Sequence, residues 1–383
     1  MPCHDVIIVG AGAAGLSLAL AIIRGPLRGA SILLIDHDAK DSDDRTFAYW
    51  EEAARPGDPQ LLREWSELAV RGPGFELALA LRERRYRVIR AIDFYRAALA
   101  ELRACPGVEL LRAEAGLVRD GGHAASVEIE GRRAEGRFVF DSRFAWRDLR
   151  VSRRRTLVRQ HFLGWEVETS APRFDPDRVV LFDFREIGAP GEFFYLLPYA
   201  ADRALVEWVG LAPADAQARL RDYLARCWGV ESPTLRRREG GVSPLTDHRF
   251  RRRLGQRVMA IGTRGGRIKP SSGYAFVRIR EDAAAIARSL AARGHPFDVD
   301  DERLRYRFYD AVLLQIMRHR PQDLPALFEA MFAGVGGDRV LAFLDGEATF
   351  TERLELFRGL PWAPFLAGFG RLLVARAGLA RRA

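Results

Sequence analysis

The chain is poor in the residues that build cross-linked or membrane-spanning proteins. It contains three cysteines, Cys3, Cys105 and Cys227, without a C-x-x-C spacing, so the sequence predicts neither a disulfide framework nor a metal site. No uninterrupted apolar run reaches the roughly 18 residues that a membrane-spanning helix needs. The first residues lack the basic segment of a secretory signal. We therefore expect a cytoplasmic protein.

Lysine is almost absent. Lys40 and Lys269 are the two lysines among 60 basic residues, and the formal net charge is +9. The arginine excess has two readings: it can follow from the base composition of the genome, or it can reflect anionic partners such as phosphates or an acidic bilayer surface. No RNA-binding signature or zinc finger accompanies it, so nucleic acid is not an expected partner.

The first 36 residues have the pattern of one βαβ unit. An apolar, β-branched run at residues 6–9 predicts a strand buried on both faces. Residues 16–23 predict a helix of small and apolar side chains that can pack closely on a sheet. Residues 31–35 predict the next strand.

The turn between the first strand and the helix carries a G-x-G-x-x-G pattern. Gly10 permits a tight turn, Gly12 lets the backbone approach a pyrophosphate, and Gly15 lets helix and strand pack closely. Asp36, at the end of the second strand, can accept hydrogen bonds from ribose hydroxyls and disfavours a 2′-phosphate. The unit predicts a site for FAD or NAD rather than NADP. The alternative is a glycine turn in an α/β domain that binds no nucleotide.

The pattern of apolar and polar residues changes twice along the rest of the chain. Residues 58–68 predict an amphipathic helix, residues 151–250 hold the alternating segments of an antiparallel sheet, and residues 258–261 return to the pattern of a buried strand. We predict an α/β fold with a Rossmann-like dinucleotide-binding domain, an inserted antiparallel-sheet substrate domain and a helical C-terminal region. The predicted boundaries are 1–150 and 251–295 for the two parts of the binding domain, 151–250 for the substrate domain and 296–383 for the helical region.

Three further segments carry specific patterns. Residues 44–50 read D-R-T-F-A-Y-W, residues 140–143 read F-D-S-R, and residues 261–274 read I-G-T-R-G-G-R-I-K-P-S-S-G-Y. Together with the glycine fingerprint they resemble the lycopene cyclase family, FAD-dependent enzymes that form ionone rings on carotenoids. The resemblance extends in order over nearly the whole chain through residues 160–168, 174–176, 181–185, 194–198, 204–207, 343–347 and 360–361.

The resemblance implies FAD that is active in its reduced form, with NAD(P)H as an external reductant. Arg45 or Lys269 near the flavin would favour its anionic reduced state. A surface ion pair is the alternative role for each of these cations. The residues expected at the cofactor are Gly10, Gly12, Ala13, Ala14, Gly15, Asp36, Asp44, Arg45, Thr46, Gly262, Gly265, Gly266, Lys269, Pro270, Ser271, Gly273 and Tyr274.

The family's reaction is an isomerisation that begins when an acid protonates a terminal alkene. Because an alkene is a poor base, the acid must be held protonated in an apolar pocket, where burial raises its pKa. The resemblance places this acid at Glu207, although a solvent-facing glutamate is the alternative. The family's F-L-E-E-T motif has a second acid and a threonine where this chain has Trp208 and Val209, which leaves the identity of the polyene open.

A carbocation needs electron-rich neighbours, and a desolvated aromatic face can contribute about 2 kcal/mol through cation–π attraction. The aromatic side chains expected along the substrate are Phe162, Trp165, Phe194, Tyr195 and Trp208.

A hydrophobic polyene substrate implies a membrane surface as partner. Residues 360–382 mix apolar rings with arginines, which suits an interfacial helix on anionic lipid and equally suits an ordinary terminal helix packed on the core. We therefore expect a protein peripheral to the membrane. Two other functions stay open: an FAD-dependent monooxygenase or prenyl reductase of the same fold, and an inactive polyene-binding homologue. The sequence does not specify β-, γ- or ε-ring formation, or reaction at one end or both.

Overall fold

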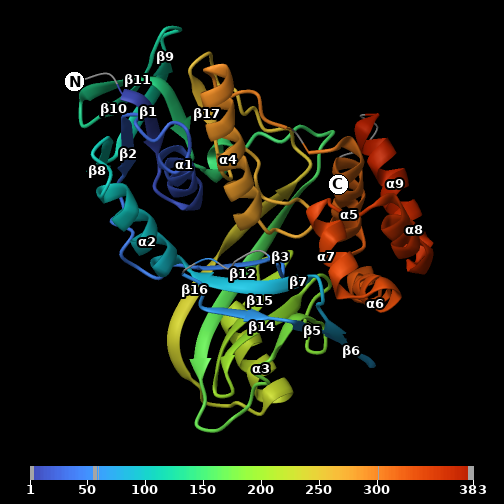
Figure 1. Ribbon diagram of the computed structural model, residues 1–383. Helices are drawn as coiled ribbons and strands as arrows, with labels where there is room; N and C mark the ends of the chain where they lie inside the picture. Colours follow the sequence, from blue (N-terminus) through green and yellow to red (C-terminus); the bar gives the residue numbers. More distant parts are fainter. Residues whose placement is uncertain (1–3, 55–57, 59, 301, 378–383) are drawn as a thin grey trace.

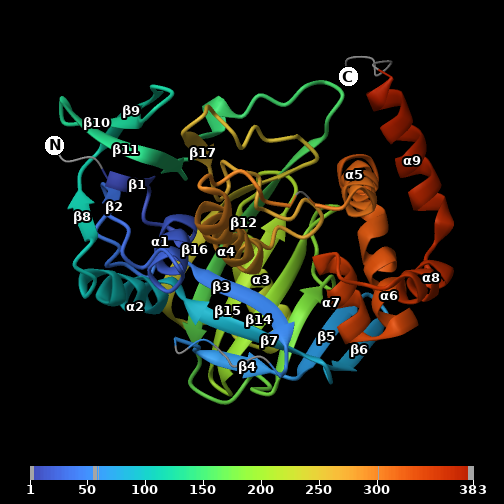
Figure 2. The same ribbon diagram turned by 45° about the horizontal axis from the view of Figure 1, so that its top comes forward.

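The computed structural model describes residues 4–54, 58, 60–300 and 302–377. Within these ranges the chain forms two seven-stranded sheets, a small three-stranded sheet and a group of C-terminal helices beside the second sheet (Figures 1 and 2). The predicted mixed α/β organisation is therefore confirmed.

The first sheet contains the N-terminal βαβ unit. β1 pairs in parallel with β2 and with β11, and its residues 6–9 are at most 3% exposed. Three helices, α1, α2 and α4, cover one face of this sheet. The strands, in sheet order, are β8 (Val108–Arg112), β2 (Ile32–Asp36), β1 (His4–Val9), β11 (Arg132–Asp141), β10 (Ala125–Ile129) and β9 (Ala115–Asp120), with β17 (Val258–Ala260) parallel to β11; the helices are α1 (Ala13–Ile23), α2 (Ala91–Arg103) and α4 (Phe276–Arg293).

The second sheet is antiparallel except for the pair of β13 and β5. Helix α3 (Ala216–Trp228) packs on one face, and the C-terminal helices contribute to the core on the other (Figure 1). Its strands, in sheet order, are β16 (Thr234–Thr246), β12 (Leu157–Glu168), β15 (Arg203–Gly210), β14 (Phe193–Ala200), β13 (Arg178–Asp183), β5 (Glu67–Gly72) and β6 (Phe75–Ala80).

The prediction of a helix over residues 58–68 is wrong. Where the structure describes this stretch, it contains β4 (Arg63–Trp65) and the start of β5, and residue 59 lies outside the described ranges. The segment becomes a strand because β7 (Arg84–Arg90) pairs with both β4 and β3 (Thr46–Glu52) to form the small sheet. Pairing with a distant strand outweighs the local helical periodicity here.

The second sheet also takes strands from outside the predicted substrate domain. β5 and β6 come from the first 150 residues and extend the sheet formed by residues 157–246. The domain boundaries as such stay a prediction. What the topology establishes is that the two large sheets are joined by several crossings of the chain.

The C-terminal helices pack against each other and against the second sheet. Among the described helices none is long and apolar enough to cross a membrane. α9 lies close to α5 at Gly368, where a Cβ would come within 3.1 Å of the Val312 carbonyl oxygen. The bounds of the helices are α5 (Leu304–His319), α6 (Leu324–Val335), α7 (Gly337–Asp345), α8 (Phe350–Gly359) and α9 (Trp362–Arg376).

Candidate functional site

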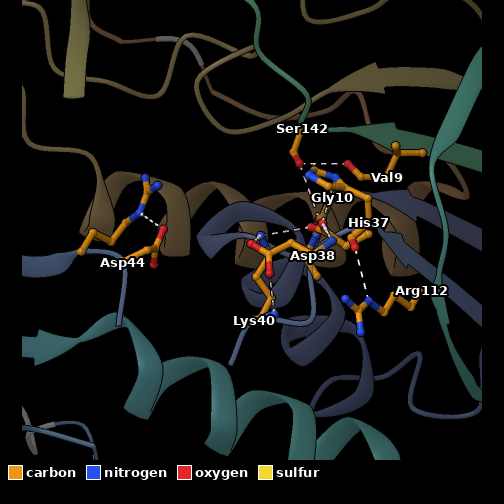
Figure 3. A network of polar contacts seen from close by, with 11 residues as sticks. Val9, Gly10, His37, Asp38, Lys40, Asp44, Arg112 and Ser142 are labelled. Carbon is orange, nitrogen blue, oxygen red and sulfur yellow. Dashed lines mark hydrogen bonds and ion pairs between the residues drawn. The ribbon is translucent and has the colours of Figure 1, made fainter. Parts of the chain in front are cut away.

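The glycine turn after β1 has the close contacts that its spacing predicts. Gly10 has a φ of 98°, a conformation that favours glycine, and Ser142 donates its hydroxyl hydrogen to the Val9 carbonyl oxygen at 2.8 Å (Figure 3). A Cβ on Gly15 would lie 1.9 Å from the Gly10 carbonyl oxygen. Glycine at position 15 is therefore required for α1 to approach the end of β1.

The N-terminus of α1 faces a cavity. Gly12, Ala13 and Ala14 line it, and a Cβ on Gly12 would meet no atom within 4 Å. No side chain caps this helix end, so its free N–H groups are available to an anion. The turn therefore fits the pyrophosphate of a dinucleotide.

Asp36 is held beside this turn by local hydrogen bonds. One carboxylate oxygen accepts from the Ala11 N–H at 2.6 Å and the other accepts from the Asp38 N–H at 2.9 Å. Lys40 lies 3.4 Å from Asp36 and 3.3 Å from Asp38 (Figure 3). The end of β2 thus places the acid next to the glycine turn, as the βαβ spacing predicts.

The second glycine-rich segment contacts the first. A Cβ on Gly262 would come within 2.8 Å of the Ala14 Cβ, so the loop after β17 lies directly against the start of α1. Of the residues expected at the cofactor in this loop, Gly262, Ser271, Gly273 and Tyr274 line the same cavity as Gly12, whereas Gly265, Gly266 and Pro270 line a different cavity.

The two cations expected near the flavin have different surroundings. Arg45 lines the cavity and forms an ion pair with Asp44, with 2.8 Å between nitrogen and oxygen. Lys269 does not line the cavity. It is 3% exposed, and its ammonium group binds Glu302 at 2.6 Å and Asp310 at 3.0 Å. The expectation of a flavin-facing Lys269 is therefore corrected: two carboxylates hold its charge elsewhere.

The cavity continues from the two glycine loops across the second sheet. Its volume is about 610 Å³. Asp44, Arg45 and Thr46 also line it. The part over the sheet is lined mainly by apolar and aromatic side chains, among them Phe162, Leu181, Phe182, Phe184, Phe193, Tyr195, Val209, Leu211, Met317, Leu324, Phe328 and Leu344. Such a surface suits a long hydrophobic ligand.

A row of four residues crosses the sheet beneath this cavity. Tyr195 on β14 pairs with Glu207 on β15, Glu207 pairs with Gly164 on β12, and Gly164 pairs with Glu239 on β16. A Cβ on Gly164 would lie 3.0 Å from the Glu239 Cγ and 3.1 Å from a Glu207 carboxyl oxygen. The glycine therefore leaves room for two carboxyl groups to lie side by side over the strand between them.

Glu207 is in the surroundings that a neutral carboxyl needs. It is 5% exposed, and its Oε2 atom is buried without a hydrogen-bond partner. Burial raises its pKa well above the usual range, the Glu239 carboxylate raises it further, and hydrogen bonding with Tyr195 acts in the opposite direction. Glu207 thus lines the cavity in surroundings that favour the neutral form of its carboxyl group.

Glu239 has the opposite kind of environment. Its carboxylate accepts a hydrogen bond from the Thr46 hydroxyl at 2.8 Å and forms an ion pair with Arg237. Arg237 also donates to the Thr46 hydroxyl oxygen at 2.6 Å. Glu239 therefore has a cation and a hydrogen-bond donor beside it, whereas one carboxyl oxygen of Glu207 has no hydrogen-bond partner. When two carboxyl groups have different surroundings, their pKa values differ, so that one can donate a proton while the other accepts one.

Glu239, Arg237 and Gly164 are absent from the residues expected from sequence. The local sequence around Glu239 is rich in charge and resembles a solvated strand face. One signal was available: Gly164 interrupts a strand pattern, and an isolated glycine in a strand marks a close approach of other groups. That signal does not identify the groups, because they lie 43 and 75 residues away along the chain.

The five expected substrate aromatics fall on two faces of the sheet. Phe162 and Tyr195 line the cavity. Trp165, Phe194 and Trp208 instead belong to the buried cluster around α3. Since successive side chains of a strand point to opposite faces, the neighbours of Glu207 and Tyr195 point away from the cavity.

The expectation for these three rings is therefore corrected. Phe194 stacks on Tyr223 of α3 with ring centroids 4.0 Å apart, and Trp208 is 2% exposed in the same cluster. Trp208 occupies the position of the family's second acid and points into this core. The second carboxyl group at the cavity is instead Glu239, from a different strand.

Comparison with known proteins agrees with this geometry. Residues 5–368 match the family model described as "Lycopene cyclase protein". A lycopene beta-cyclase from Paracoccus sp. is 27% identical over 94% of this chain and 95% of its own length. A lycopene beta-cyclase from Pantoea ananas is 24% identical over 97% of this chain and 98% of its own length.

Solved structures share the fold at much lower identity. A geranylgeranyl bacteriochlorophyll reductase-like protein from Thermoplasma acidophilum superposes with a TM-score of 0.61 at 14% identity, covering 98% of this chain and 100% of its own. The flavin-dependent brominase Bmp2 gives a TM-score of 0.61 at 15% identity, with 98% and 100% covered. The fold is thus one that flavoproteins use, and the match to the family model over nearly the whole chain shows that this protein belongs to the lycopene cyclase family.

Proposed function

We propose that the chain binds FAD and cyclises lycopene or a related acyclic polyene without net oxidation. The observation that carries this proposal is the buried carboxyl group of Glu207, whose pKa is raised by burial, at the wall of an apolar cavity that continues to the glycine turn. Gly12, Ala13 and Ala14 would hold the pyrophosphate, and Gly262, Gly273 and Tyr274 would line the flavin. The reduced flavin would supply electron density that stabilises a nearby cation.

The cyclisation assigns a separate task to each group at the cavity. Glu207 gives its proton to a terminal double bond, and a tertiary carbocation forms as the alkene electron pair makes the new C–H bond. Attack by a second double bond closes the ring. A carboxylate at the cavity wall, Glu207 itself or its neighbour Glu239, then takes up the proton whose loss restores an alkene, so that protons and electrons balance. The faces of Phe162 and Tyr195 stabilise the cation, and the apolar walls exclude the water that would trap it.

Purified protein tests this function directly. Incubation with lycopene, FAD and a reductant under anaerobic conditions is expected to give cyclic carotenoid, measured by chromatography, with no NAD(P)H consumed in step with product. Consumption of one NAD(P)H per product under these conditions would instead support a reductase. A monooxygenase needs O2, so it would form an oxygenated product, with one NAD(P)H consumed, only in a parallel aerobic incubation. Bound flavin with no turnover of any polyene would support an inactive binding homologue. Ring type and the number of ends that react follow from the same chromatogram.

Two alanine substitutions distinguish the two roles of the glycine turn. In Gly15→Ala the new methyl group meets the Gly10 carbonyl oxygen, so we expect a lower melting temperature and loss of flavin. In Gly12→Ala the new methyl group points into open space of the cavity, so we expect an unchanged melting temperature of the flavin-free protein and weaker FAD binding. Thermal unfolding and fluorescence titration with FAD measure these effects. Equal FAD affinity in Gly12→Ala and wild type would contradict the assignment of the pyrophosphate.

The C-terminal helices are the proposed contact with the membrane. Several large apolar side chains of α5, α8 and α9 are exposed, with Leu304 at 74%, Phe350 at 72%, Trp362 at 58% and Leu366 at 64%. α9 both packs on α5 through Gly368 and presents this exposed face, so the two readings of the terminal segment are compatible. Residues 378–383 of the chain lie outside the described ranges. The cytoplasmic side of the membrane stays a prediction.

A further inference from the structure

A second cavity, which we call the arginine cavity, lies between the end of β16, the loop at residues 263–270, α5 and α9. Its volume is about 510 Å³. Among the described residues that line it are seven arginines and three carboxylates. The cavity is therefore a concentration of positive charge, and nothing in the proposed cyclisation uses it.

Each of the three carboxylates already forms an ion pair with a lysine or an arginine. Lys269 binds both Glu302 and Asp310, and Asp247 lies 3.6 Å from Arg155. Asp247 also forms an ion pair with Arg376 of α9. Arg278 also pairs with Glu302, at 3.2 Å, and Asp282, just outside the wall, pairs with Arg252 and Arg267. The seven arginines and Lys269 still outnumber these four carboxylates among the described residues.

Two of these arginines have donor capacity left. The Arg252 guanidinium donates to Asp282 through Nη2, while its Nε and Nη1 atoms are buried without a hydrogen-bond partner. A buried donor without an acceptor is costly, which indicates that an acceptor belongs in this region. Arg249 lies at the exposed edge of the cavity. Several guanidinium groups around one hollow are suited to the oxygens of a phosphate group.

The edge of the arginine cavity toward α5 and α9 is apolar and exposed. Leu304 and Phe308 of α5 line it with exposures of 74% and 44%. Phe369 and Leu373 of α9 line it with exposures of 39% and 53%. A free phosphate would gain nothing from contact with these apolar side chains, because they offer it no hydrogen-bond donor. An amphiphile with a phosphate head and acyl tails would contact both parts.

We propose that the arginine cavity binds the phosphate headgroup of an anionic membrane lipid while Leu304, Phe308, Phe369 and Leu373 enter the acyl region. This proposal rests on the membrane contact in the proposed function and names the lipid class and its site. We call the cavity that Glu207 and the glycine turn line the polyene cavity. The arginine cavity shares Pro244, Thr263 and Ile268 with its wall. A headgroup bound here therefore holds the polyene cavity next to the bilayer in which the substrate dissolves.

Vesicle co-sedimentation of the full-length protein tests the site without any polyene. Vesicles of phosphatidylcholine alone are compared with vesicles that also contain phosphatidylglycerol, at low and high salt. We expect strong binding to the anionic vesicles, weakened by salt. Arg249→Glu is expected to weaken that binding about tenfold or more. The substitution removes one positive charge and adds one negative charge, and each of these changes weakens binding to an anionic surface several-fold. Leu304→Asp tests the apolar edge in the same assay.

Arg119→Glu is the matched control, because Arg119 is an exposed arginine of β9 in the other sheet and the charge change is the same. Equal losses in the two variants overturn the site and leave only overall charge. Titration with inorganic pyrophosphate gives the second arm. Saturable binding that Arg249→Glu abolishes, without preference for anionic vesicles, overturns the lipid assignment in favour of a soluble phosphate ligand. Cyclisation of lycopene in detergent is measured separately, so failure of this site and failure of the cyclase function are distinguishable.

Discussion

Replacing Glu207 by glutamine is expected to lower the rate of cyclisation by roughly 10²- to 10⁴-fold, the range that a positioned general acid contributes. The amide has nearly the same size as the carboxyl but cannot give up a proton to an alkene. The polyene cavity and the glycine turn stay intact, because Glu207 lies on β15 and does not contact the turn. Product formation by chromatography and bound flavin by absorbance after desalting measure the two parts of this expectation.

Glu109→Gln provides the control for this substitution. Glu109 is an exposed residue of β8, at the edge of the first sheet, and its replacement makes the same chemical change far from the cavity. We expect wild-type turnover in Glu109→Gln. Wild-type turnover in Glu207→Gln would remove Glu207 from the mechanism, and loss of flavin together with turnover would point to a structural role instead.

Replacing Glu239 by glutamine is expected to shift the alkaline limb of the pH–rate profile to lower pH. The proposed cyclisation needs Glu207 protonated, so we expect activity to fall as pH rises through the raised pKa of Glu207. Removing the Glu239 charge removes a neighbour that raises this pKa and leaves Arg237, which lowers it, without its carboxylate. Both changes lower the Glu207 pKa. At a fixed pH on that limb, the rate falls about tenfold when the Glu207 pKa becomes lower by one.

Two further variants separate this effect from general damage to the sheet. Arg237→Gln removes a cation that lowers the Glu207 pKa and is expected to move the alkaline limb to higher pH. Glu168→Gln, on β12 and paired with Arg236 at the exposed end of the sheet, should leave the limb unchanged. A profile that stays at the same pH in Glu239→Gln and Arg237→Gln would show that these side chains do not set the protonation of Glu207.

Elements with local causes were predictable from the sequence. The strand at residues 6–9, the glycine turn and the acid at the end of the next strand follow from contacts within 36 residues, and the structure contains them at those places. Residues 58–68 were mispredicted because their strand partner, β7, lies further along the chain.

Side-chain direction was predictable only where strand alternation was applied. Alternation places Trp208 on the face opposite Glu207, and the structure agrees. Selecting aromatic residues by type ignored that rule, and three of the five rings belong to the core around α3. The surroundings of Lys269 were not predictable either, because its two carboxylate partners, Glu302 and Asp310, lie more than 30 residues further along the chain.

The sequence by itself determined the family and the glycine turn, and it singled out Glu207 as the candidate acid, since each depends on short spacings and on residue type. Only the tertiary structure decided which groups surround the Glu207 carboxyl and raise its pKa. Strand register brings Glu239 beside Glu207 across Gly164, and Arg237 and Thr46 both bind the Glu239 carboxylate. A raised pKa depends on burial and on charges a few ångströms away, and the packing of strands distant in the sequence sets both.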